Sequence, residues 1–70
     1  MKNIKYVIYK EVNYYVSQCL NIDISSFGNT IEEAKQNLIE AVSLFFEEEG
    51  SEKEFIPIDD AMLGENTINV

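Results

Sequence analysis

The amino-acid sequence predicts one α+β domain over residues 1–70, with the element order β-β-β-α-β. Two stretches rich in β-branched and aromatic residues and a third, shorter stretch with apolar residues come before residue 28, and a long amphipathic stretch with helix start and stop signals follows. A short alternating segment ends the sequence. We therefore expect a single helix packed on one face of a mainly antiparallel sheet.

Three strands are expected in the first 28 residues. Residues 4–10 and 14–20 are rich in the residue types that favour strands, and the three residues between them are few enough for a hairpin. That link has no glycine, so it does not specify a turn type. A third short strand, at about residues 22–27, leads the chain back towards Gly28.

The clearest local signal is the start of the helix. Thr30 is a good N-cap residue and Glu33 stands three positions later, which is the spacing of a capping box. Gly28 is interpreted as the residue that allows a sharp turn through a backbone conformation that other residues resist. Ala34, four residues after Thr30, is one of the apolar residues on the buried side of the predicted helix.

The helix is expected to run from Ile31 to about Glu49 and to end at Gly50. Six apolar residues fall at the spacing of one buried stripe: Ile31, Ala34, Leu38, Ala41, Val42 and Phe45. Ile39 and Phe46 stand on the shoulder of this stripe, where they rim the core or meet another chain. Three glutamates, residues 47–49, lie at the negative end of the helix dipole, which is electrostatically unfavourable.

The rest of the sequence predicts less regular structure. Residues 51–54 are polar, and residues 55–58 contain Pro57, so we expect an extended connector or edge piece. Residues 59–64 are expected to form one helical turn between two aspartates and a glycine. Residues 67–70 alternate in polarity and are expected to form the last strand.

Composition favours a small folded domain that needs a partner. Hydrophobic residues make up 46% of the chain. Burying apolar surface stabilises the fold by on the order of 100 kcal/mol, and ordering the chain costs about the same. The chain alone is therefore marginally stable, and we expect self-association or a partner. Thirteen acidic residues against five lysines give a net charge of −8. This charge disfavours the binding of nucleic acid and favours association with a basic protein. The alternative interpretation is that it simply keeps a small protein in solution.

The location expected from these residues is cytoplasmic. No apolar run approaches the roughly 20 residues of a membrane span, and residues 1–5 do not lead into a signal-peptide core. The single cysteine, Cys19, has no partner for an internal disulfide and is expected to be a small buried hydrophobe in a strand.

Catalytic, cofactor and metal sites are not expected. The chain has no histidine, so Ser-His and Cys-His pairs and imidazole-ligated metals are excluded. Asp23, Asp59 and Asp60 are the candidates for a magnesium-dependent nuclease cluster, but loop aspartates are more commonly surface or capping residues. The tyrosines at 6, 9, 14 and 15 are expected to be core and cross-strand partners rather than a stacking platform.

Several motifs in order resemble the HicB-like antitoxins. The resemblance spans about residues 4–48 and begins in Tyr15-Val16-Ser17-Gln18-Cys19-Leu20. It continues through Ser26-Phe27-Gly28-Asn29 and is strongest at Thr30-Ile31-Glu32-Glu33-Ala34, followed by Asn37-Leu38 and Glu40-Ala41. Phe27 departs from the pattern, since a polar residue is usual there, and Val12-Asn13 replaces a frequent glycine pair.

The resemblance implies a partial ribonuclease-H-like fold and a domain without catalysis of its own. It implies that the domain covers a small basic toxin of the HicA type, which cleaves messenger RNA. Family members often carry an added DNA-binding module, and the sequence through Val70 holds none, so direct nucleic-acid binding is not expected.

The expected partner surface lies on the helix. Ile39 and Phe46 would provide apolar contact, and Glu40, Glu47 and Glu48 would attract a basic toxin. We expect the domain to act as a homodimer or higher oligomer. The alternative function is an orphan domain whose self-association or small-ligand binding is itself the function.

Overall fold

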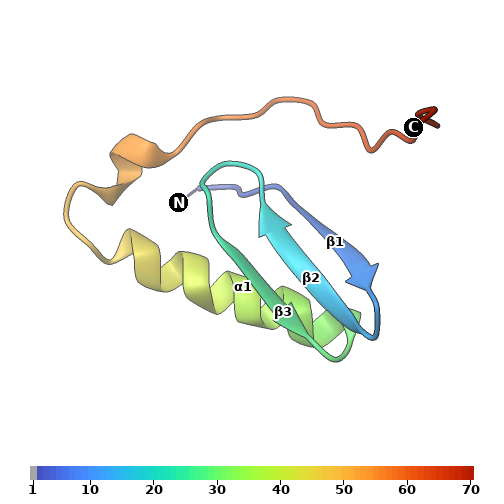
Figure 1. Cartoon of the computed structure of the whole chain (residues 1–70). Helices are drawn as coiled ribbons and strands as arrows, with labels where there is room; N and C mark the ends of the chain where they lie inside the picture. The colour runs from blue at the N-terminus through green and yellow to red at the C-terminus, as the bar shows by residue number, and fades with distance from the viewer. Residues whose placement is uncertain (1) are drawn as a thin grey trace.

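The computed structural model describes residues 2–70 and has two layers, a sheet and a helix (Figure 1). Its elements, in order, are β1 (Tyr6–Glu11), β2 (Tyr14–Cys19), β3 (Ser25–Gly28), α1 (Ile31–Phe46) and the short 3₁₀ helix η1 (Ser51–Glu54). The α+β class is confirmed, because α1 lies against one face of a three-stranded antiparallel sheet.

The sheet is a meander in the order β1-β2-β3. Glu11 pairs with Tyr14, so Val12 and Asn13 alone form the turn of the predicted hairpin. Val12 has a φ of 55°, a left-handed conformation that usually favours glycine, and its side chain is exposed. Tight pairing of the two strands therefore imposes this conformation on a β-branched residue.

The core lies between α1 and the strands β2 and β3. The buried apolar residues are Cys19, Ile22, Ala34, Leu38 and Val42. Ser17 is also fully buried, and its hydroxyl donates a hydrogen bond of 2.8 Å to the carbonyl of Ala34. The predicted stripe is correct at its centre, but Ile31 is 56% exposed.

The helix start is confirmed, with two differences in detail. Thr30 Oγ1 accepts a 3.0 Å hydrogen bond from the Glu33 N–H, as expected, but the Glu33 carboxylate accepts from the N–H of Asn29 rather than of Thr30. Gly28 does not have a positive φ. A Cβ there would lie 2.6 Å from the backbone nitrogen of Ala34, so glycine is required by close approach of strand and helix.

The largest shifts from the predicted boundaries are at the end of the helix and at the start of the third strand. The helix ends at Phe46 rather than at Glu49, with Glu47 as its C-cap, and its last turn contains no basic residue. Three adjacent glutamates oppose the helix dipole there, which accounts for the early end. Gly50 has a φ of 83° and begins η1 instead of ending α1. The third strand begins at Ser25, because the backbone first turns between Ile22 and Ile24.

The predicted fourth strand and the predicted helical turn are both wrong. Residues 59–64 and 67–70 are irregular and exposed, and the chain after η1 runs past the N-terminal segment without joining the sheet (Figure 1). A four-residue alternating segment forms a strand only when it pairs with a neighbouring edge, and residues 67–70 do not lie along one. The irregular tail, residues 55–70, is instead attached at its beginning, where the Ile56 N–H donates to the Asn21 carbonyl.

Candidate protein-binding groove

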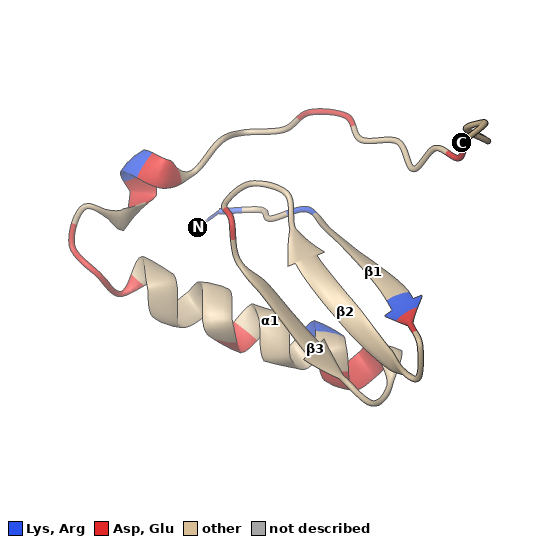
Figure 2. Cartoon of the chain, in the orientation of Figure 1, with Lys and Arg blue, Asp and Glu red and all other residues tan. Residues whose placement is uncertain are grey.

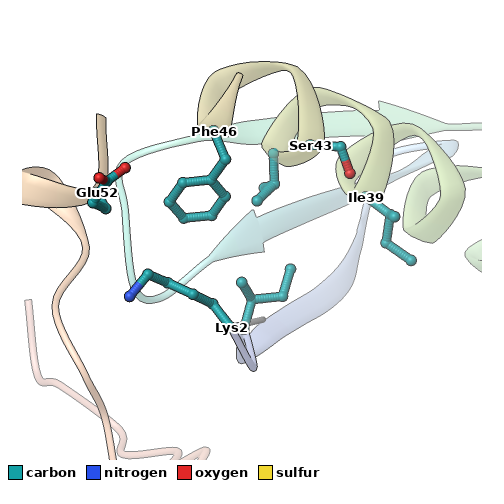
Figure 3. A pocket seen from close by; sticks show the side chains of 7 residues that line it. Lys2, Ile39, Ser43, Phe46 and Glu52 are labelled. Carbon is teal, nitrogen blue, oxygen red and sulfur yellow. The ribbon is translucent and has the colours of Figure 1, made fainter. Parts of the chain in front are cut away.

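A groove of about 430 Å³ lies beside the second half of α1 (Figure 3). The residues that line it are Lys2, Ile4, Ile39, Val42, Ser43, Phe46 and Glu52. It forms because α1 packs mainly over β3 and β2, which leaves space between the helix and the segment that leads into β1. We call this the α1 groove.

The helical wall of the α1 groove contains both predicted shoulder residues. Ile39, Ser43 and Phe46 recur at four- and three-residue spacing, so their side chains share one side of the helix (Figure 3). Ile39 is 37% exposed, whereas Phe46 is half-buried. The structure thus brings the two apolar members of the predicted partner surface together in one groove.

Phe46, which lines the α1 groove, also packs against two aromatic rings that do not line it. The ring of Phe46 lies 5.5 Å from that of Phe45 and 6.1 Å from that of Phe55, measured between centroids. The Lys2 ammonium lies 4.7 Å from the centroid of the Phe55 ring. These contacts connect the helix, the segment after η1 and the N-terminal segment.

The acidic members of the predicted surface lie outside the α1 groove. Glu40, Glu47 and Glu48 are exposed on α1 and at its end, and none of them lines the groove. The chain after α1 carries further carboxylates, some at η1 and the loop before it and others along the tail (Figure 2). We define the acidic rim as Glu47, Glu48, Glu49, Glu52 and Glu54, all of which are exposed. Glu52 joins this rim to the groove.

Three residues in or beside the groove had no signal in the sequence as partner contacts. Lys2 and Ile4 line the groove from the beginning of the chain, whereas Phe55 does not line it and contacts the Phe46 ring from beyond η1. An isolated aromatic residue after a polar run, as at Phe55, is the one local feature that could have indicated a packed position. The other two depend on which part of the sheet the helix leaves uncovered.

The alternative sites considered from the sequence are not assembled. Asp23, Asp59 and Asp60 are exposed, and no three His, Cys, Asp or Glu side chains of residues 2–70 are grouped to hold a metal ion. Cys19 is 2% exposed in β2, so its predicted role as a small buried hydrophobe is confirmed.

The tyrosines are divided between the two faces of the sheet. Tyr6 and Tyr15 occupy the alternating positions that face α1, together with the buried Ser17, whereas Tyr9 and Tyr14 lie on the outer face. The Tyr14 ring meets Phe27 edge to face, with centroids 6.0 Å apart. The four rings therefore do not form one stacking platform.

A scan against protein-family models, a search of curated proteins and a search of solved structures each give no match to this chain. Among residues 2–70, the structure also contains no helix long and apolar enough to cross a membrane. The geometry of the α1 groove and its acidic rim is thus the basis for assigning a function.

Proposed function

We propose that this chain is a HicB-like, non-catalytic binding domain that masks a small basic toxin of the HicA type. The observation that carries the proposal is the α1 groove with the acidic rim at one end. An apolar pocket beside clustered carboxylates fits a partner that presents an apolar side chain within a basic surface. The ordered motifs from Tyr15 to Ala41 support the family, and with it a partial ribonuclease-H-like fold.

The proposed mechanism is occlusion. The acidic rim and the net charge of −8 steer a basic partner to this end of the molecule. Ile39 and Phe46 then lose water against an apolar side chain of the partner, which holds the complex together. The domain needs no reactive group, because covering the RNA-binding surface of the toxin is enough to stop cleavage. We place this complex in the cytoplasm and expect the domain to act in it as a homodimer or higher oligomer.

The test is to search beside this gene for a sequence that encodes a small basic protein and to co-express the two proteins. We expect the two proteins to co-purify, and we expect the domain to restore growth and stop RNA cleavage when the basic protein is induced. A neighbour that is toxic but neither binds the domain nor is relieved by it would contradict the proposal.

A second candidate is an orphan domain that binds a small ligand. The volume of the α1 groove, about 430 Å³, favours it, because pockets for small molecules are typically about 300–1,000 Å³. Its mostly apolar lining between Lys2 and Glu52 fits an apolar molecule with a polar end. A metabolite library screened by thermal shift should then give a ligand that an Ile39→Glu variant no longer binds. A screen without such a ligand would remove this candidate.

A further inference from the structure

The two edges of the sheet differ in how they are covered. At β3, the side-chain amide of Asn37 donates a 2.8 Å hydrogen bond to the carbonyl of Phe27, so α1 occupies part of that edge. At β1, the Lys5 carbonyl accepts a hydrogen bond from the Leu20 N–H and so points towards β2. Because backbone groups alternate in direction along an antiparallel strand, those of Tyr6, Ile8 and Lys10 point away from β2, towards the open edge. Within the described chain no strand pairs with this edge.

The molecule also exposes more surface than a compact monomer of its size. Its accessible surface is 5843 Å², whereas a folded monomer of 8.0 kDa is expected to expose about 4,450 Å². Its radius of gyration is 13.7 Å against an expected value of about 11 Å. Part of this excess belongs to the irregular tail, which is nearly all exposed and includes Met62 and Leu63 beside the beginning of β1.

We infer that the β1 edge binds the β1 strand of a second copy of this chain, antiparallel and related by a two-fold axis. In such a pair, the residues whose backbone groups point away from β2 hydrogen-bond to one another across the two copies. These are the even-numbered residues of β1, so each pairs with an even-numbered residue of the second copy. Centring the axis on Ile8 places Lys5 of each copy opposite Glu11 of the other. This register aligns almost the whole strand and pairs opposite charges at both ends.

A second groove beside the β1 edge provides space for the incoming strand. This β1 groove has a volume of about 460 Å³ and is lined by Ile4, Lys5, Tyr6, Val7, Leu20, Ala61, Met62 and Leu63. It separates the beginning of β1 from the irregular tail. The Ile8-centred register brings Tyr9 and Val12 of the second copy to this groove, where their exposed side chains meet the exposed Met62 and Leu63.

This inference deepens the homo-oligomeric part of the proposed function and does not depend on a basic partner. It names the second copy as the occupant of the β1 edge, whereas the toxin is assigned to the α1 groove. The two proposals are tested separately, because self-association is measured on the purified chain alone.

Charge exchange tests the register. In Lys5→Glu a negative charge lies opposite Glu11 of the other copy, and in Glu11→Lys a positive charge lies opposite Lys5 of the other copy. Each variant should therefore weaken dimerisation about tenfold in sedimentation equilibrium. The double variant should restore the dimer. Within one chain the two residues lie roughly 20 Å apart along the strand, so such rescue requires contact between copies. Lys53→Glu, the same charge change at an exposed residue of η1, should leave dimerisation unchanged.

Three results would overturn the inference. The first is a wild-type chain that remains monomeric at high concentration, for example because residues 67–70 pair with β1 of their own chain. The second is a pair of single variants that dimerise like the wild type. The third is a double variant that stays as weak as the single ones while circular dichroism shows all of them folded.

Disulfide trapping gives an independent readout. In a Cys19→Ala background, Ile8→Cys places two thiols at the symmetry axis, where the Cα atoms of a hydrogen-bonded pair are about 5.5 Å apart and a disulfide can form. Oxidation should give a covalent dimer. Phe27→Cys, at the exposed face of β3, is the matched control. Cross-linking of Ile8→Cys no faster than of Phe27→Cys would exclude pairing at this edge.

Discussion

At the scale of single residues, the three glycines differ in why a larger residue would be disfavoured: lack of space for a Cβ at one, backbone strain at another and neither at the third. A Cβ on Gly28 would lie 2.6 Å from Ala34 N, a Cβ on Gly50 meets open space but sits at a φ of 83°, and Gly64 has neither constraint. We expect alanine to lower the free energy of unfolding by about 2 kcal/mol at Gly28, about 1 kcal/mol at Gly50 and less than about 0.5 kcal/mol at Gly64.

Urea denaturation of the three alanine variants measures these differences. Gly64→Ala serves as the matched control, because its Cβ would come no closer than 3.7 Å to the Met62 side chain. If Gly28→Ala were as mild as Gly64→Ala, the close approach of β3 to α1 would not be the reason for glycine at position 28.

The outer face of the hairpin holds a residue-scale contact that responds to pH. The Tyr14 hydroxyl donates a 2.7 Å hydrogen bond to Glu11 Oε1. This hydrogen bond, with the negative charge of Glu11, raises the pKa of Tyr14, because both favour the neutral phenol. The folded-state pKa then lies above the unfolded one, so the contact contributes stability below about pH 10 that is lost as the phenol ionises at higher pH.

Removing the carboxylate should reverse this shift. We expect Glu11→Gln to lower the pKa of Tyr14 towards its ordinary value, as measured by NMR titration of the tyrosine ring carbons. Glu54→Gln, at the end of η1, is the control and should leave the Tyr14 titration unchanged. An unchanged pKa of Tyr14 in Glu11→Gln would show that the hydrogen bond is not formed in solution.

At the scale of elements, a buried asparagine joins segments that are far apart in the sequence. Asn21 Oδ1 accepts a 2.7 Å hydrogen bond from Lys5 N, and Asn21 Nδ2 donates one of 2.8 Å to the Ile56 carbonyl. Its own carbonyl accepts from the Ile56 N–H. This residue therefore attaches both the beginning of β1 and the start of the irregular tail to the connection between β2 and β3.

Replacing this side chain should loosen both attached segments. We expect Asn21→Ala to lower the free energy of unfolding by about 2 kcal/mol, since it leaves Lys5 N and Ile56 O without partners. Hydrogen exchange should become faster in residues 4–6 and 55–58. Asn66→Ala, at an exposed position, is the control. Unchanged exchange in both segments would mean that the asparagine does not hold them.

The elements that the sequence predicts well are those with local signals. Two alternating strands and the Thr30 cap depend on residues close together in the chain, and the structure has them nearly where expected. The fourth strand failed because strand formation at residues 67–70 depends on an edge elsewhere. The α1 groove itself was not predicted: of the residues that line it, Ile39 and Phe46 stand out from helix periodicity, whereas Ile4 depends on how the helix lies across the sheet.

At the scale of the whole molecule, charge is distributed unequally. Every acidic residue except Glu11 and Asp23 lies at or after the start of α1, so β2 and β3 carry no charge (Figure 2). The proposed basic partner would thus be attracted to the helix, η1 and the tail, which leaves the sheet edge to the proposed second copy. Binding and self-association can take place on different surfaces.

This separation predicts opposite responses to salt. Between about 0.05 and 0.5 M salt we expect the affinity for the basic partner to fall about tenfold or more, because the attraction is screened. Two copies that each carry a net charge of −8 repel each other, so self-association should hold or strengthen. Isothermal titration and sedimentation at matched salt measure both. A partner affinity that does not change with salt would contradict electrostatic steering by the acidic rim.

The most direct test of the account is a titration of the basic partner into two helix variants. Ile39→Glu introduces a charge inside the α1 groove, and Leu44→Glu introduces the same charge on the same helix at a residue that is 57% exposed and outside the groove. The account predicts that Ile39→Glu weakens binding at least about thirtyfold, whereas Leu44→Glu changes it less than about threefold. Equal effects of the two substitutions, or no effect of Ile39→Glu, would show that the partner does not bind in the α1 groove.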